Sequence, residues 1–183
     1  MTRELRGNLV TLVGLDVDGA AVGVLVDATG RLVVDGGGGN MVSTHKARAY
    51  ANTNQVIPDA TWTKILLDSE TYDPGANFDI VNCQYVAPVA GYYHVHVRVC
   101  YEGAVVVTAK RVGLSCYVNN ADVCSELHHT ASATTIRPGA GDTIHLNVGD
   151  VVTAYTYHTF GVASALVGGS LYTALSIFCI SED

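Results

Sequence analysis

The stretch from Tyr85 to Val99 reads YVAPVAGYYHVHVRV, and it decides the fold class. Pro88 and Gly91 are residue types that favour a tight turn, and an alternating run begins directly after them. From Tyr93 onward every second residue is apolar, which is the period of a β-strand with one buried face. The apolar residues are predicted to face a core. The polar face is predicted to consist of Tyr92, His94, His96 and Arg98.

Short strand-like runs separated by turn residues continue through the rest of the chain from Lys46. Hydrophobic residues make up 49% of the 183 residues and charged residues only 15%, which is the composition of a folded domain. Long runs with a helical period are scarce. Short strands at this spacing are typical of a sandwich or jelly roll, so the predicted fold class is all-β. The predicted strands are residues 47–50, 61–67, 84–87, 92–101, 105–107, 112–118, 123–127, 143–146, 151–157 and 171–180.

Three short apolar runs occupy the first part of the chain, at residues 9–17, 21–26 and 32–34. Asp18-Gly19 separates the first two and is a hairpin signal, because glycine adopts the positive φ that such turns require. Three strands of this length cannot bury both of their faces alone, so they need a partner surface. We predict that this segment attaches the protein to a partner through Leu9, Val13, Val24, Val26, Leu32 and Val34.

Four consecutive glycines, Gly36–Gly39, follow these runs. They carry no side chains to pack and favour a flexible chain, so they are predicted to mark a domain boundary. Two domains are expected on this basis. Residues 1–39 form a β-hairpin attachment segment that ends in the tetraglycine linker, and residues 45–183 form the main domain.

Three motifs occur in order in the main domain. Phe78-Asp79 leads to a P-x-x-G-x-Y turn at residues 88–93. Residues 144–152 then read IHLNVGDVV, which contains an L-x-x-G-D-x-V turn, and residues 169–175 read GSLYTAL. With these motifs, the segment from about Ala47 to the C-terminus resembles the C1q-like branch of the tumour-necrosis-factor (TNF) jelly roll.

This resemblance implies a C1q/TNF-like jelly-roll head that forms homotrimers about a threefold axis, with one sheet of each copy packed against its neighbours. Ala174 stands where the family often has glycine and Leu175 where it often has an aromatic residue, and both departures concern packing detail. If the face with His94 and His96 lines the threefold axis, three copies bring six imidazoles close together. Hydrogen bonding at a polar interface is the favoured interpretation over a transition metal or pH-sensitive assembly. The residues placed at the trimer interface are His94, His96, Arg98, Tyr155, Tyr157 and Tyr172.

Residues 22–32 read VGVLVDATGRL and are similar to short V-D-x-x-G-R-L elements in structural proteins of tailed phages. Together with a C1q-like head, this similarity indicates a non-enzymatic virion protein, either a capsid decoration or a short head, neck or tail appendage. The N-terminal segment is then expected to bind the capsid or another virion protein. Assembly is expected in the host cytoplasm.

Two alternative functions stay open. The first is a receptor-binding or adhesin tip that recognises a cell-surface glycan through aromatic platforms, for which Tyr155, Tyr157 and Tyr172 are candidates. The second is a secreted bacterial C1q-like protein. Asp16 and Asp18 directly follow the apolar run near the N-terminus without a small-residue cleavage site, so a signal peptide is not expected.

Charge and motif content argue against several other classes. The net charge is −7 and the ten Lys and Arg residues are scattered singly, whereas nucleic-acid binding needs clustered basic residues. No apolar run is long enough to span a bilayer. Serine, histidine and aspartate do not occur in a nucleophile-elbow context, and the glycine run lacks the Lys-Ser/Thr of a phosphate loop. We therefore expect no enzyme activity, no cofactor, no metal, no nucleic acid and no membrane partner.

The five cysteines are an odd number and form no Cys-x-x-Cys pair, so buried free thiols are predicted. A hairpin that turns at Asn120-Ala121 would place Cys116 opposite Ser125 and Cys124 opposite Tyr117, on different faces of the sheet. No disulfide is expected between them.

Overall fold

The computed structural model describes residues 12–15, 21–26, 32–33, 44–101, 109–130 and 135–183. Every regular element in these ranges is a β-strand. The described residues accordingly contain no helix that would be long and apolar enough to cross a membrane. The chain divides into two compact units, Met1–Val42 and Ser43–Asp183, which are described separately.

The first unit contains a three-stranded antiparallel sheet in the order β1-β2-β3. Its strands are β1 (Leu12–Leu15), β2 (Ala21–Val26) and β3 (Leu32–Val33). Four of the predicted attachment residues lie on these strands: Val13, Val24, Val26 and Leu32. The other two, Leu9 and Val34, and the tetraglycine linker lie outside the described residues.

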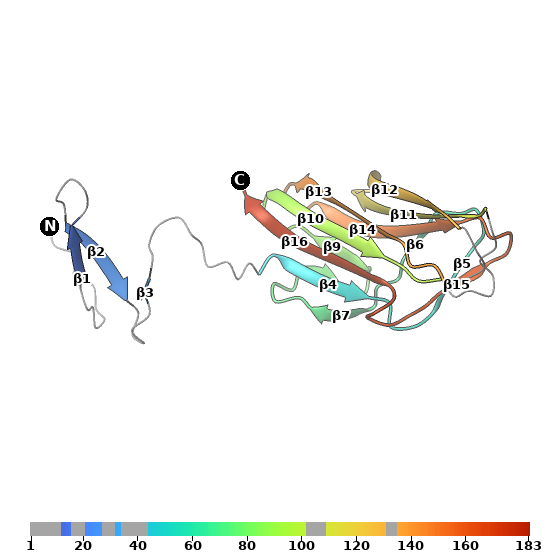
Figure 1. Cartoon of the computed structure of the whole chain (residues 1–183), viewed down its shortest axis with the longest axis horizontal. Coiled ribbons are helices and arrows are strands. Elements are labelled where there is room, and N and C mark those ends of the chain that lie inside the picture. Colours follow the sequence, from blue (N-terminus) through green and yellow to red (C-terminus); the bar gives the residue numbers. More distant parts are fainter. Residues whose placement is uncertain (1–11, 16–20, 27–31, 34–43, 102–108, 131–134) are drawn as a thin grey trace. The chain divides into compact units, whose positions relative to one another are not determined.

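The second unit is a sandwich of two antiparallel sheets (Figure 1). We call the sheet with the order β13-β10-β16-β4-β7 sheet I. It consists of β4 (Lys46–Tyr50), β7 (Ser69–Tyr72), β10 (Gly91–Arg98), β13 (Gly139–Leu146) and β16 (Ala174–Glu182).

Sheet II has the order β12-β11-β14-β9-β8, and β6 also pairs with β14. It consists of β6 (Thr63–Lys64), β8 (Phe78–Asp79), β9 (Gln84–Val86), β11 (Arg111–Val118), β12 (Ala121–His129) and β14 (Val151–His158). A separate two-stranded sheet pairs β5 (Gln55–Ile57) with β15 (Ser164–Leu166).

The core lies between the two sheets, and strand β10 shows how the sequence builds it. Tyr93, Val95 and Val97 are buried, whereas the residues between them are half-buried or exposed, so the predicted orientation of this strand is confirmed. Strands of both sheets contribute alternate residues to the same cluster. These include Val112, Leu114 and Cys116 from β11, Val152 and Ala154 from β14, and Leu175 and Ile177 from β16.

Several strand boundaries differ from the predictions. The predicted strand at 61–67 is a strand only at Thr63–Lys64, although Ile65 and Leu67 are buried as an alternating pattern requires. Strands β5, β7, β8 and β15 were not predicted, because they are short and β7 reads SETY, without an apolar alternation. The last strand begins at Ala174 rather than Leu171. The predicted strand at 105–107 lies outside the described residues.

The predicted register of the hairpin between β11 and β12 is wrong. The turn residues are Asn119 and Asn120, both with positive φ, and a bulge shifts the register between Cys116 and Tyr117. Asparagine tolerates the left-handed conformation that a tight hairpin needs. Because both turn residues are asparagines, the turn lies one residue before its predicted place. As a result Cys116 lies opposite Cys124, and both are free thiols. Burial raises the pKa of the Cys116 thiol to about 12.

Gly91 is the first residue of β10, and its lack of a side chain allows a close approach to β16. A Cβ atom placed on Gly91 would overlap the carbonyl oxygen of Ser181, whereas one placed on Gly149, at a φ of 86°, would meet nothing within 4 Å. We therefore expect Gly91→Ala to lower the free energy of unfolding by about 3 kcal/mol or more. Gly149→Ala carries only backbone strain, worth about 1–2 kcal/mol. Urea unfolding of both variants measures the difference, and equal losses would contradict the steric explanation.

Candidate functional site

The face of sheet I that points away from the core carries a mixture of aromatic and basic side chains. On β10 and β16 the exposed apolar residues are Tyr92 (51% exposed), Phe178 (44%) and Ile180 (55%). The His94 ring lies 5.4 Å from the Phe178 ring, and the Tyr92 ring meets the His145 ring edge-on at 5.2 Å. We call this face, with these residues, Lys46, Arg48, His96, Arg98 and Ser176, the outer face of sheet I.

His96 occupies the middle of this face. It is paired in register with Gly141 on β13 and Ser176 on β16. Cβ atoms placed on Gly139 and Gly141 would come within 2.9 and 3.0 Å of the imidazole, so the ring lies over bare backbone on β13. Burial lowers the pKa of His96, and His94 and Arg98 lower it further. The structure therefore favours the neutral imidazole.

Arg48 and Arg98 lie beside His96 at the end of the face towards the β15–β16 loop. Both guanidinium groups donate hydrogen bonds to the carbonyl oxygen of Ser170 in that loop. Arg48 also donates to the Thr71 hydroxyl on β7. Burial, and then the charge of Arg48, lower the pKa of Arg98. These contacts place two like charges close together.

The six predicted interface residues do not share one surface. His94, His96 and Arg98 lie together on the outer face of sheet I. Tyr155 and Tyr157 lie on β14 in sheet II, on the opposite side of the sandwich. Tyr172 lies in the β15–β16 loop, where the Arg137 guanidinium is 5.0 Å from its ring centre.

The outer side of sheet II has a polar cavity of about 290 Å³. Tyr155 forms one wall, and its ring meets Tyr117 edge-on at 4.3 Å. Lys64 Nζ donates one hydrogen bond, of 2.7 Å, to the Asn82 carbonyl oxygen. Within the described residues, no hydrogen bond occupies the side chains of Gln84, Asn120 and Thr153. The full lining is Lys64, Gln84, Asn119, Asn120, Val151, Thr153 and Tyr155.

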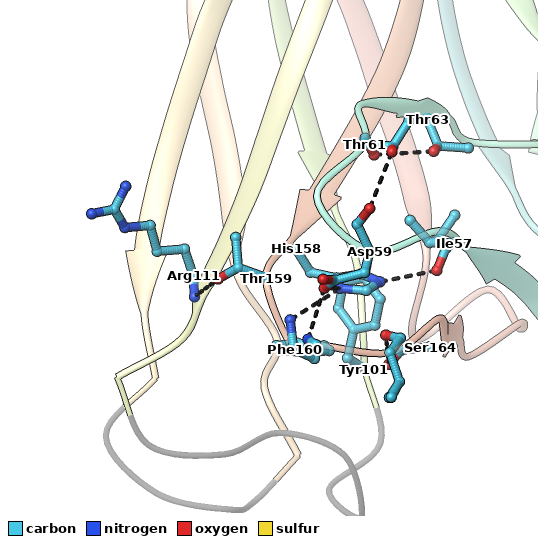
Figure 2. Close-up of polar contacts among 12 residues, drawn as sticks. Ile57, Asp59, Thr61, Thr63, Tyr101, Arg111, His158, Thr159, Phe160 and Ser164 are labelled. Atoms are coloured by element: carbon cyan, nitrogen blue, oxygen red, sulfur yellow. Dashed lines mark hydrogen bonds and ion pairs between the residues drawn. The ribbon is translucent and has the colours of Figure 1, made fainter.

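His158 is fully buried at the end of β14 (Figure 2). Its Nε2 lies 3.0 Å from the Ile57 carbonyl oxygen, and the Phe160 amide donates to Nδ1 at 3.4 Å. The Asp59 carboxylate lies 3.3 Å from Nδ1. Both ring nitrogens are thus occupied. Ser164 Oγ donates to the Val162 carbonyl oxygen instead, so these residues do not form a serine nucleophile with a histidine base.

Sequence reasoning missed most of these groupings. Arg48 and Ser170 are 122 positions apart, and His158 and Ile57 are 101 apart, so no local motif connects either pair. Only the alternation in β10 carried a usable signal. The six other residues that line the cavity around Tyr155 come from β6, β9, the β11–β12 turn and β14 itself, so no single local motif identifies them.

No known family profile matches the chain, and no curated protein matches its sequence. Solved structures do match. The globular domain of zebrafish complement 1qA protein matches with a TM-score of 0.56 and 16% identity, over 75% of this chain and 98% of that one. The crystal structure of murine APRIL at pH 5.0 matches with a TM-score of 0.54 and 14% identity, over 74% of this chain and 99% of that one.

Eiger TNF from S. frugiperda is a third match, with a TM-score of 0.53 and 10% identity over 75% of this chain and 93% of that one. Identities this low establish the fold alone. Together with the two-sheet topology, they confirm the predicted jelly roll: this chain has the C1q/TNF-like fold.

Proposed function

We propose that this protein is a non-enzymatic virion structural protein that forms a homotrimer through the outer face of sheet I. The observation that carries the self-association is the exposure of Tyr92, Phe178 and Ile180 on one face. Exposed apolar side chains gathered on one sheet face are typical of a protein–protein contact surface. The C1q-like resemblance implies that one sheet of each copy packs against its neighbours, and the outer face of sheet I offers exposed apolar residues for such a contact.

Aromatic and aliphatic residues give this surface its expected binding energy. Burying Phe178 and Ile180 in a contact would contribute about 25 cal/mol for each Å² of apolar surface removed from water. His94, whose ring is tilted against that of Phe178, and the half-buried His96 supply hydrogen-bonding groups for a polar part of the interface. Oligomer interfaces commonly combine apolar and polar groups in this way.

Sedimentation equilibrium of the full-length chain tests the trimer. At micromolar concentration we expect a mass of three chains of 19.3 kDa each. Phe178→Glu places a charge in the proposed contact and is expected to yield monomers. Leu127→Glu is the matched control, because Leu127 is a similarly exposed strand residue on β12, and it is expected to stay trimeric. A monomeric wild type would refute the trimer, and a trimeric Phe178→Glu would place the contact elsewhere.

The virion assignment rests on the N-terminal unit. Residues 22–32 carry the similarity to phage structural proteins. β1, β2 and β3 form a small sheet, and among the described residues no further strand pairs with its edges, where a partner strand could add. We propose that this sheet attaches the jelly roll to the capsid or another virion protein, with assembly in the host cytoplasm. The jelly-roll head then decorates the particle or forms a short appendage.

Deletion of residues 1–42 tests this attachment. The full-length chain is expected to co-purify with intact particles through a density gradient, whereas residues 43–183 are expected to stay at the top as a folded protein. The unit boundary supports the deletion, since residues 43–183 form a compact unit. Particles that lack the full-length chain by mass spectrometry would refute the virion function, and particles that retain the truncated chain would refute the role of the N-terminal sheet.

The polar cavity on sheet II favours glycan binding as a second candidate function. Amides, a hydroxyl, an ammonium group and an aromatic ring converge there around Tyr155. Sugars offer hydroxyl groups to such amides and an apolar ring face to such aromatics. In this function the protein would be a receptor-binding tip.

Glycan arrays probed with the full-length protein test this candidate. We expect Tyr155→Ala to lower the affinity for any saccharide that binds on the array by about tenfold, which corresponds to a loss of about 1.4 kcal/mol of binding free energy. Tyr157→Ala is the matched control, because Tyr157 lies on the same face of the same strand but packs against Trp62 outside the cavity. A blank array, or equal effects of both variants, would remove this candidate.

A further inference from the structure

Arg48 and Arg98 come from different strands of sheet I and meet at one oxygen atom. Arg98 Nη2 donates to the Ser170 carbonyl oxygen at 2.8 Å, and Arg48 Nη2 donates to the same oxygen. Because two hydrogen bonds of about 3 Å share this acceptor, the two nitrogens are at most about 6 Å apart. An uncharged carbonyl therefore holds two positive charges together.

No carboxylate balances this pair among the described residues. The ion pairs recorded there all join a histidine to a carboxylate, and none includes Arg48 or Arg98. The chain as a whole has 17 Asp and Glu residues against 10 Lys and Arg, so acidic groups are in excess. Partial burial of two arginines without a counter-charge destabilises the folded state, unless an anion binds to them.

The residues between the two arginines are small, and one of them offers a further donor. On β16, Ser176 lies in register between His96 and Arg48, and Ala174 lies beside Arg98. Both are small residues flanked by long ones. Within the described part of the chain, the Ser176 hydroxyl makes no side-chain hydrogen bond. The His96 ring lies over the glycines of β13, on the other side of β10 from Ser176.

Within the part of the chain that the structure describes, most donors of the two guanidinium groups have no hydrogen-bond partner. Each guanidinium carries five N–H groups. Arg48 uses one for Thr71 and one for Ser170, and Arg98 uses one for Ser170. The remaining N–H groups are more numerous than one carbonyl can accept. This arrangement suits an acceptor with several oxygens.

We propose that Arg48, Arg98 and Ser176 form a binding site for a small oxyanion of the phosphate or sulfate class. A guanidinium fork matches such oxygens with two parallel N–H bonds. A tetrahedral anion has acceptors in several directions, so it bridges both arginines and also accepts from the Ser176 hydroxyl. In the trimer, on which this last consequence rests, the anion also reduces repulsion between arginines of neighbouring copies.

Isothermal titration of the full-length protein with inorganic phosphate, at constant ionic strength in chloride, tests the site. We expect saturable binding of about one phosphate per chain, and competition by sulfate. Arg98→Gln is expected to weaken the affinity at least about tenfold, because it removes a charge-assisted hydrogen bond. Arg98→Lys keeps the charge without the fork and is expected to be intermediate. Arg111→Gln, an exposed arginine on β11, is the control and is expected to bind like the wild type.

Absence of saturable binding by the wild type would overturn the site, as would an unchanged affinity in Arg98→Gln. Should Arg98→Gln fail to fold, as judged by circular dichroism, Ser176→Ala replaces it, with an expected weakening of about threefold to tenfold. Sedimentation of the same samples separates this proposal from the trimer. A trimer that binds no phosphate refutes only the anion site, and a monomer that binds phosphate refutes only the trimer.

Discussion

The alternation of side chains along β10 is the constraint on which the rest of the structure depends. This strand pairs with β13 on one side and β16 on the other, and it buries Tyr93, Val95 and Val97 completely. A slip of one residue in its register would bring histidines and an arginine into the core and carry the valines to the surface. The cost of burying those polar groups fixes the register of all three strands, and thereby the composition of the outer face of sheet I.

The two neighbours of β10 are adapted to the side chains that it turns outward. On β13, glycines at 139 and 141 make room for the His96 ring, and on β16, small residues lie beside Arg98 and His96. At the other end of β10, Gly91 permits a close approach to β16 near a bulge that follows Tyr92. The sequence of one strand therefore determines which residue sizes its partners tolerate, although these partners are 40 or more positions away.

The sequence predicted the all-β class and the jelly roll because both depend on local signals. Alternation and turn residues revealed β10, and Asn147 to Val151 revealed the turn into β14. The register of the β11–β12 hairpin could not be predicted from such signals, because two asparagines and a bulge determine it. The grouping of Arg48 with Arg98 could not be predicted from them either. It arises from the strand order β10-β16-β4, a non-local property that no spacing of residues along the chain records.

The outer face of sheet I has different chemistry at its two ends. Tyr92 is the second residue of β10 and Arg98 is the last, and the six residue steps between them span about 20 Å. Apolar burial near Tyr92 favours association of any similar surface, whereas two unbalanced guanidinium groups near Arg98 resist it, because a charge loses hydration on burial. In the trimer that we propose, the apolar end would therefore supply the driving force for self-association, and an anion bound by the arginines would lower the cost of burying the basic end. Association of this face is for that reason expected to be sensitive to oxyanions in a way that apolar burial alone is not.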